Sequence, residues 1–328
     1  SRDLVAALTP LLKERALGGY VRHCHGDLHL RNIVEVDGVP VLFDAIEFDD
    51  KLATIDILYD LAFLLMDLGA RGLTEHANAV LNAYLDASGD TGNLIGLAAL
   101  PLFLSMRAMV RAKVERLRER LARGQTQAEA FRKVASYINL ARDYIQPSRP
   151  HLIAIGGLSG SGKSSVARAL APKLGAFPGA VHVRSDRERK RLFGVSGDER
   201  LPKTAYRKDI SDTVYRICRK RALMAISGGR AVIVDAVHAG PEEREAIAGL
   251  ARRMGVAFTG IWLEAPTAIM TRRIEGRASD ISDATPSVLQ EQLTYDLGPQ
   301  SFAVVDAGRP LDDVVATCLE LITGSNAV

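Results

Sequence analysis

The chain has 328 residues, a length that predicts two domains of ordinary size. Its composition, 47% hydrophobic and 25% charged, is that of a soluble globular protein. A net charge of +3 is too small to indicate a nucleic-acid or membrane partner. The three cysteines are widely spaced and form no CxxC motif, so the sequence indicates neither a disulfide framework nor a zinc site, and we expect a cytoplasmic protein.

The first part of the chain is expected to be mainly helical. Residues 1–20 predict one helix that ends at Gly18-Gly19, and a short strand from Tyr20 then leads into a loop. Asp37-Gly38 is a turn signal between two apolar runs and predicts a hairpin. From Thr54 to about Tyr144 the pattern is nearly all helical, without a strand signal. The apolar repeat is clearest at Leu58, Leu61, Ala62, Leu65 and Leu68. The longest apolar stretches, such as 94–104, are too short to cross a bilayer.

A change of composition divides the chain at residues 146–150, where Gln-Pro-Ser-Arg-Pro reads as a linker. We therefore expect one domain over 1–145 and a second over 151–328. In the second, short β-branched runs alternate with helical segments, a pattern typical of a parallel sheet covered by helices on both faces. The expected fold class is α/β, with about five strands, at 151–155, 181–183, 231–234, 259–263 and 302–305.

The most specific motif is Gly157-Leu-Ser-Gly-Ser-Gly-Lys-Ser164, a complete G-x-x-x-x-G-K-[ST] sequence between a predicted strand and a predicted helix. Glycines let the backbone wrap a phosphate, and the helix N-terminus favours the negative charge. We expect Lys163 to hold the β- and γ-phosphates of ATP, and Ser164 to ligate magnesium. The alternative without a function is a Gly/Ser turn that binds no ligand. The predicted nucleotide-binding residues are Gly157, Ser159, Gly160, Ser161, Gly162, Lys163, Ser164 and Ser165.

Two aspartates end predicted strands, at the edge where open α/β sheets bind ligands. Asp186 follows the second strand and could take the proton of an acceptor hydroxyl; alternatively it caps the helix expected at 187–192. Asp235 ends the third strand and could reach magnesium through water; alternatively it is a turn residue.

Arginines surround these candidate site residues. Arg184, Arg187 and Arg189 lie close to Asp186 in the sequence and could pair with an anionic acceptor. Arg273 and Arg277 precede a polar segment that reads as a lid, and their charges could stabilise the transferring phosphoryl group. For each arginine, a solvated surface position is the alternative.

These motifs together resemble the zeta-toxin-like, gluconate-kinase-like and polynucleotide-kinase-like P-loop kinases, over roughly 151–308. The resemblance implies that the P-loop binds ATP-magnesium, that Asp186 is the base acting on the acceptor, and that Arg273 or Arg277 clamps phosphates.

A second motif lies near the start of the chain. In His25-Gly-Asp27-Leu-His-Leu-Arg-Asn32, an aspartate and an asparagine are separated as in a kinase catalytic loop, where the aspartate accepts the substrate proton and the asparagine holds magnesium. Asp44 follows the predicted hairpin, at the place of a metal-binding aspartate.

This stretch is similar to the aminoglycoside phosphotransferase family, closely over 21–68 and loosely beyond. The resemblance implies a base role for Asp27, magnesium ligation by Asn32 and Asp44, and a loop-supporting role for Asp60. The two halves in this order look like a bacterial fusion of an aminoglycoside phosphotransferase and an ATP-binding protein. Only a predicted helix precedes the loop, and the initiator Met is missing. We therefore expect the phosphate-covering lobe to be absent from this piece, or the domain to be a scaffold.

The sequence thus predicts a kinase that transfers phosphate from ATP to a small hydroxylated acceptor through residues 151–328. One alternative is an ATP-binding regulatory module that forms no phosphorylated product. Another is a polynucleotide 5′-kinase, which would need stacking aromatics, whereas aromatic residues are only 5% of the chain.

Overall fold

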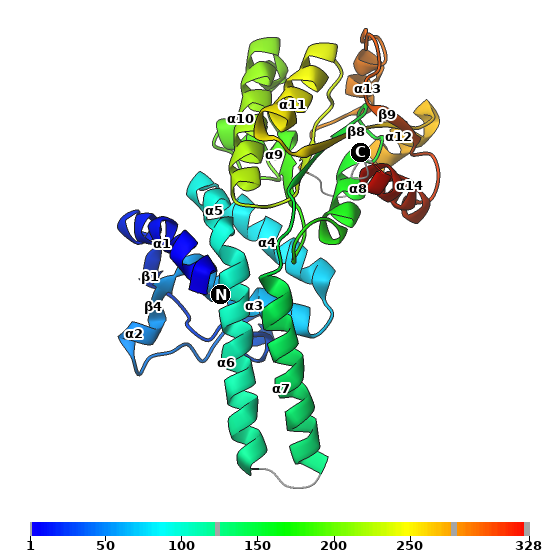
Figure 1. Cartoon of the computed structure of the whole chain (residues 1–328). Coiled ribbons are helices and arrows are strands. Elements are labelled where there is room, and N and C mark those ends of the chain that lie inside the picture. The colour runs from blue at the N-terminus through cyan, green and yellow to red at the C-terminus, as the bar shows by residue number, and fades with distance from the viewer. Residues whose placement is uncertain (1, 122–124, 277–280, 325–328) are drawn as a thin grey trace. The chain divides into compact units, whose positions relative to one another are not determined.

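The computed structural model describes residues 2–121, 125–276 and 281–324, in two compact units (Figure 1). The N-terminal unit comprises Ser1–Leu85, Gly92–Ser148 and Ala176–Pro178. The C-terminal unit comprises Asp86–Thr91, Arg149–Gly175 and Gly179–Val328. The change of unit after Ser148 falls within the proline-containing segment 146–150.

The N-terminal unit is mainly helical and carries two small antiparallel strand pairs, β1 with β4 and β2 with β3. Its elements are α1 (Arg2–Leu17), β1 (Val21–His23), η1 (Leu30–Asn32), β2 (Ile33–Val36), β3 (Val39–Leu42), α2 (Asp50–Ala53), β4 (Thr54–Asp56), α3 (Ile57–Ala70), α4 (Thr74–Ser88), α5 (Thr91–Gly96), η2 (Leu97–Ala99), α6 (Leu100–Leu121) and α7 (Gln125–Tyr144).

The predicted hairpin is confirmed as β2–β3, in which Val36 pairs with Val39. Both turn residues have positive φ, 52° at Asp37 and 76° at Gly38, as the tight two-residue turn of a twisted hairpin requires.

The prediction of a nearly all-helical pattern without a strand from Thr54 onward was wrong at its start. Thr54–Asp56 forms β4, which pairs antiparallel with β1. Three residues are too few to show strand alternation, so the sequence carried no signal for it. Asp56 holds this junction together: its carboxylate accepts a hydrogen bond from Leu58 N at the start of α3 and forms a buried ion pair with Arg15 at 2.7 Å.

Helix α3 buries the predicted apolar stripe of Leu58, Leu61, Ala62, Leu65 and Leu68, and it packs against α6, which runs beside α7 (Figure 1). Within the described residues, one helical run, Thr91–Arg120, is long and apolar enough to cross a membrane. It is longer than the apolar stretch considered from the sequence because α5, η2 and α6 follow one another directly. Of its most apolar window, 61% is buried inside the fold, as in the core helix of a soluble protein.

The C-terminal unit has the predicted α/β architecture. Its elements are β5 (His151–Gly156), α8 (Lys163–Leu170), η3 (Ala171–Lys173), β6 (Val181–Arg184), α9 (Ser185–Leu192), η4 (Lys203–Tyr206), α10 (Lys208–Ser227), β7 (Val232–Asp235), α11 (Pro241–Met254), β8 (Ala257–Glu264), α12 (Thr267–Glu275), α13 (Pro286–Gln292), β9 (Ala303–Asp306) and α14 (Leu311–Gly324).

The five strands form one sheet in the order β6-β7-β5-β8-β9, and every pair is parallel. Helices α8 and α14 pack on one face, and α10 and α11 on the other (Figure 1). Alternate strand residues supply the two faces: Ile153, Ile233 and Ile261 belong to the core cluster shared with α8 and α14. This confirms the predicted sheet of about five strands covered on both faces.

The strand order determines where the site lies. Strand β7 is the neighbour of β5 on one side and of β6 on the other. Because the strands are parallel, their carboxyl ends meet at one edge, and the segments that follow β5, β6 and β7 come together there. The P-loop and Asp186 lie in these segments, and Asp235 is the last residue of β7 itself.

Packing of the sheet gives a direct test at Gly260 of β8. A Cβ there would lie 2.2 Å from Cδ1 of Phe302, a buried ring that also contacts the rings of His238 and Phe258. We expect Gly260→Ala to lower the free energy of unfolding of the C-terminal unit by about 1–3 kcal/mol, the usual cost of overpacking. Urea unfolding would measure it. Gly249→Ala is the control, since its Cβ would meet only the flexible ends of two arginines; an equal effect of both changes would contradict the packing argument.

Candidate active site

The P-loop between β5 and α8 adopts a backbone that only glycine accommodates at three positions. The φ angles of Gly157, Gly160 and Gly162 are 138°, 81° and 96°. Space is also restricted: a Cβ on Gly160 would lie 2.5 Å from the Met270 carbonyl oxygen, and one on Gly157 would lie 2.6 Å from that of Leu263. The loop is therefore fixed by its contacts with β8 and α12.

The loop leads into α8 with an open N-terminus. Gly162, in the left-handed region, occupies the N-cap position, and no side chain caps the first turn. The Ser161 hydroxyl is buried and has no hydrogen-bond partner among the described residues. A helix start that no side chain caps, together with an unsatisfied buried hydroxyl, is an arrangement that a bound phosphate would complete.

Lys163 and Ser164 begin this helix. Lys163 Nζ donates to the Leu158 carbonyl oxygen at 3.0 Å, so the ammonium group lies across its own loop. Ser164 Oγ donates to Asp235 Oδ2 at 2.6 Å. The structure thus brings the last residue of the P-loop motif to the aspartate that ends β7.

Asp235 is almost fully buried and lies beside basic side chains. His182 Nε2 lies 3.3 Å from Oδ2, and Arg184 Nε lies 3.9 Å from the same oxygen. Burial by itself raises the pKa of this carboxyl, but the hydrogen bond and charge of His182, together with Lys163 and Arg184, outweigh it and hold the pKa well below its usual range. Asp235 is therefore an ionised carboxylate.

The oxygens of Ser164 and Asp235 fit a magnesium ion that also binds phosphate. Magnesium takes oxygen ligands and usually keeps several waters, with one or two protein carboxylates. No group of three or more His, Cys, Asp or Glu side chains able to hold a metal occurs within the described ranges. The protein oxygens would thus hold the ion only in combination with water and nucleotide.

Asp186 lies beside these groups, in the first turn of α9. The N-cap of that helix is Arg184, so the alternative that Asp186 caps it was wrong. Asp186 is partly exposed by surface area, yet protein surrounds the carboxyl group closely. That burial raises its pKa, aided by the negative charge of Asp235, while a hydrogen bond with Ser282 and the charges of Lys163 and Arg184 act in the opposite direction.

Arg273 lies on α12 and contacts the P-loop directly. One guanidinium nitrogen donates to the Ser161 carbonyl oxygen at 3.3 Å, and the other donates to that of Ala307 at 2.9 Å. The alternative of a solvated surface position was therefore wrong for Arg273. The second lid candidate, Arg277, lies outside the described residues.

Two of the arginines close to Asp186 in the sequence, Arg184 and Arg189, contact different parts of the structure. Arg184 donates to Ser164 Oγ at 3.2 Å and faces the P-loop. Arg189 donates to the Ala205 carbonyl oxygen at 2.5 Å and stacks over Tyr206 with 4.7 Å to the ring centre. Arg189 thus anchors the segment that precedes α10.

Three further residues belong to this site, although the sequence did not single them out. His182 contacts Asp235 from the middle of β6. Gln292 of α13 accepts a hydrogen bond from Ser159 N in the P-loop, at 2.7 Å. Asp283 pairs with the buried Lys190 at 3.1 Å. Strand alternation could have indicated His182, because it points away from the face on which Val181 and Val183 are buried; for Gln292 and Asp283 the sequence holds no signal.

The N-terminal unit brings its own predicted residues together in part. Asn32 Nδ2 donates to Asp27 Oδ2 at 3.3 Å and to the Asp27 carbonyl oxygen at 3.0 Å. Phe43 N donates to the Asn32 carbonyl oxygen, so Asp44 follows directly at the open end of the hairpin, where its side chain is exposed. Asp60 supports the loop by accepting hydrogen bonds from the backbone N–H groups of His25 and Gly26.

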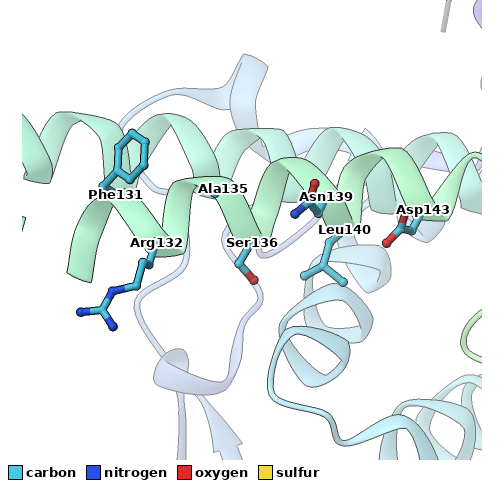
Figure 2. A pocket seen from close by; sticks show the side chains of 7 residues that line it. All are labelled: Phe131, Arg132, Ala135, Ser136, Asn139, Leu140 and Asp143. Atoms are coloured by element: carbon cyan, nitrogen blue, oxygen red, sulfur yellow. The ribbon is translucent and has the colours of Figure 1, made fainter. Parts of the chain in front are cut away.

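A surface hollow on the N-terminal unit is lined by none of the candidate site residues. It runs along one face of α7, where its lining residues recur at helical intervals (Figure 2). The lining residues are Phe131, Arg132, Ala135, Ser136, Asn139, Leu140 and Asp143.

A protein-family model matches the part of the chain that contains this site. Residues 152–295 match the family model described as an AAA domain. The matched stretch runs from β5 through α13 and contains the P-loop, Asp186, Asp235 and Arg273. Sequence relatives include uncharacterized proteins of Mycobacterium tuberculosis H37Rv and of Mycobacterium bovis, each 31% identical over 288 residues. The match covers 87% of this chain and 56% of each relative, so the chain spans about half the length of these proteins.

Solved structures similar to this chain include three kinases. A gluconokinase from Sinorhizobium meliloti has 23% identity and a TM-score of 0.38, over 54% of this chain and 92% of that one. A sugar kinase from Janibacter has 18% identity and a TM-score of 0.41, over 53% and 95%. An APS kinase from Mycobacterium tuberculosis, solved with AMPPNP and APS, has 21% identity and a TM-score of 0.39, over 54% and 99%. The C-terminal unit thus contains the segment that matches the AAA domain family model, with a P-loop at its sheet edge.

Proposed function

We propose that the C-terminal unit is a kinase that transfers the γ-phosphate of ATP to a hydroxyl group of a small molecule. The observation that carries this proposal is the 2.6 Å hydrogen bond between Ser164 and Asp235, at the start of a helix whose N-terminus is open. It joins a complete P-loop to an ionised carboxylate, the pair of groups that nucleotide-bound magnesium needs.

In this proposal, each residue of the P-loop side has a defined task. Backbone amides of the P-loop and of the first turn of α8, together with the Lys163 ammonium, bind the β- and γ-phosphates. Ser164 and Asp235 hold magnesium, Asp235 through a water molecule. The ion would neutralise charge on the phosphates, while the protein fixes their position. Arg273 keeps a further positive charge against the loop at Ser161.

Asp186 is the proposed base on the acceptor side. A general base works best when its pKa is near the working pH, and burial raises the pKa of Asp186 in that direction. Asp235, only one strand away, has the opposite shift and stays ionised. Two carboxylates with opposed pKa shifts suit the two different tasks of proton acceptor and metal ligand.

The regulatory-module alternative needs the same nucleotide site but no base. The raised pKa of Asp186 beside the P-loop favours the kinase, because a module that only binds ATP has no use for it. The polynucleotide-kinase alternative needs aromatic side chains on which bases stack. The single tryptophan, Trp262, is 2% exposed and lies in the middle of the sheet, so it cannot serve.

For the N-terminal unit, we infer a loop of the kinase catalytic type, with Asp27 as base and Asn32 and Asp44 as magnesium ligands. Support comes from the contact of Asn32 with Asp27 and from Asp60, which holds the backbone of the loop. In the protein as a whole, this unit is either a second phosphotransfer site or a scaffold. We also propose a cytoplasmic location, in keeping with three free cysteines, of which Cys218 and Cys318 are buried.

Removing the lysine tests the nucleotide site. Lys163→Ala should abolish transfer of labelled phosphate from ATP to any acceptor found in a screen, and should weaken MgATP binding at least about 10-fold, since one charge-assisted contact to phosphate is lost. Calorimetry and a labelled-product assay would measure both effects. Lys173→Ala, in η3, is the control; unchanged turnover in Lys163→Ala would refute the proposal.

Replacing Asp235 distinguishes binding of the metal from binding of the nucleotide. Asp235→Asn should weaken ADP binding in the presence of magnesium by about 10–100-fold, the usual range for a group that supports a metal through its ligands. With EDTA present, the same variant should bind ADP no worse than the wild type, because only a negative charge near the phosphates has been removed. Asp312→Asn, on the exposed side of α14, is the matched control. An equal loss with and without magnesium would exclude the metal role.

Ionisation of Asp186 should determine how kcat/KM depends on pH at the acidic end. The base works only when ionised, so kcat/KM should rise with pH through a midpoint above the ordinary aspartate value, because burial raises the pKa of Asp186. Asp186→Asn should remove this acidic limb and lower kcat by about 10²–10⁴-fold while nucleotide affinity is retained. Asp235 cannot produce the limb, since its pKa is lowered. A limb that persists in Asp186→Asn would assign the base to another group.

A further inference from the structure

The segment Ile281–Gln292, which we call the strap, contacts both sides of the candidate active site. It consists of four residues in extended or irregular conformation, Thr285, and helix α13. Its first part lies beside α9 and the segment before α10, and its last residue lies at the P-loop. The strap thus connects two loops that are remote from each other in the sequence.

At the nucleotide side, Gln292 determines the environment of one P-loop amide. Its side-chain carbonyl accepts the Ser159 N–H at 2.7 Å, and both residues are at most 9% exposed. A second contact is apolar: Leu289 of α13 is fully buried in a cluster with Met270 and Ile274, and Leu158 of the P-loop packs against that cluster. The P-loop is therefore held by α13 through a hydrogen bond and through side-chain packing.

At the acceptor side, the Asp283 carboxylate interacts with three donor groups. Its Oδ2 accepts hydrogen bonds from Leu201 N at 3.0 Å and from the Tyr206 hydroxyl at 2.9 Å, and its Oδ1 lies 3.1 Å from Lys190 Nζ. The adjacent Ser282 forms a side-chain hydrogen bond with Asp186. The conformation of 201–206, close to the proposed base, thus depends on a carboxylate of the strap.

The strap is locally stiff between these two ends. Thr285 caps α13 by accepting the Val288 N–H, and Pro286 occupies the first turn, where proline is preorganised for a helix. These two residues therefore define where α13, the helix that carries Gln292, begins.

We propose that the strap is the positioning element of the reaction: Gln292 sets the P-loop for the nucleotide, and Asp283 sets the segment 201–206 for the acceptor. Both residues act through other groups rather than on the reactants. The proposal rests on the nucleotide-binding function proposed above, and it adds residues that act on substrate binding from outside the P-loop motif.

The nucleotide arm is tested with Gln292→Met, which keeps the length of the side chain and removes the acceptor. The buried Ser159 N–H then loses its partner and the loop loses its preset conformation. We expect the Kd for MgADP, measured by calorimetry well below the unfolding temperature, to rise about 10-fold. Gln290→Met is the matched control, since Gln290 is exposed on the same helix. Gln292→Glu is the second variant, for the case that Gln292→Met does not fold: it retains an acceptor for Ser159 but adds a negative charge beside the phosphates, and should also raise the Kd.

The outcomes are distinct. If the wild type binds no MgADP, the proposed function fails and the strap proposal fails with it. If the wild type binds MgADP and both Gln292 variants stay within about twofold of Gln290→Met, only the role of Gln292 is overturned. A lower melting temperature with unchanged Kd would likewise show that Gln292 is merely structural.

The acceptor arm is tested with Asp283→Asn and hydrogen exchange. The change leaves the Lys190 ammonium buried without its counter-charge and weakens the bonds to Leu201 and Tyr206. Amide exchange in peptides covering 201–206 should become at least about 10-fold faster, since the Leu201 N–H loses its charge-assisted acceptor, while the Kd for MgADP stays within twofold of the wild-type value. Asp296→Asn, at an exposed position beyond the strap, is the control. Unchanged exchange at 201–206, or a loss of MgADP affinity equal to that of Gln292→Met, would overturn this half of the proposal.

Discussion

Parallel pairing of β7 between β5 and β6 is the constraint from which the rest of the site follows. It places Ile155 of β5 opposite Asp235, and Arg184 of β6 opposite the same residue. The P-loop and the start of α9 therefore begin one or two residues beyond the aspartate, on either side of it. A slip of β7 by one residue would turn Asp235 to the opposite face of the sheet and away from Ser164.

Two carboxyl groups at this edge of the sheet have different surroundings and therefore different pKa shifts. The basic side chains His182, Lys163 and Arg184 lie near Asp235 and hold its pKa low in spite of its burial. For Asp186, burial has the largest effect and raises the pKa, and the negative charge of Asp235 acts in the same direction. Two aspartates at the ends of neighbouring strands thus have opposed pKa shifts, which is the difference that the proposed roles of metal ligand and proton acceptor require.

The sequence was most informative where chemistry depends on local order. The P-loop motif and the alternation of strands and helices predicted the fold of the C-terminal unit. Because ligands bind at the carboxyl ends of parallel strands, the sequence also predicted that Asp186 and Asp235 lie at one edge of the sheet. The strand β4 was missed because three residues carry no period. Gln292 could not be found, because its partner Ser159 is 133 positions away, and Asp283 meets Leu201 across 82 positions. Contacts of this kind join segments that meet only when the chain has folded, so no single segment encodes them.

The chain's single tryptophan has a practical consequence. Trp262 is buried in the central part of β8, and its ring lies against Gly156, the residue directly before the P-loop. Its intrinsic fluorescence therefore reports on the C-terminal unit alone, whereas far-ultraviolet circular dichroism records helices of both units. Comparing the two signals during denaturation distinguishes a chain that melts in a single cooperative transition from one whose halves melt separately.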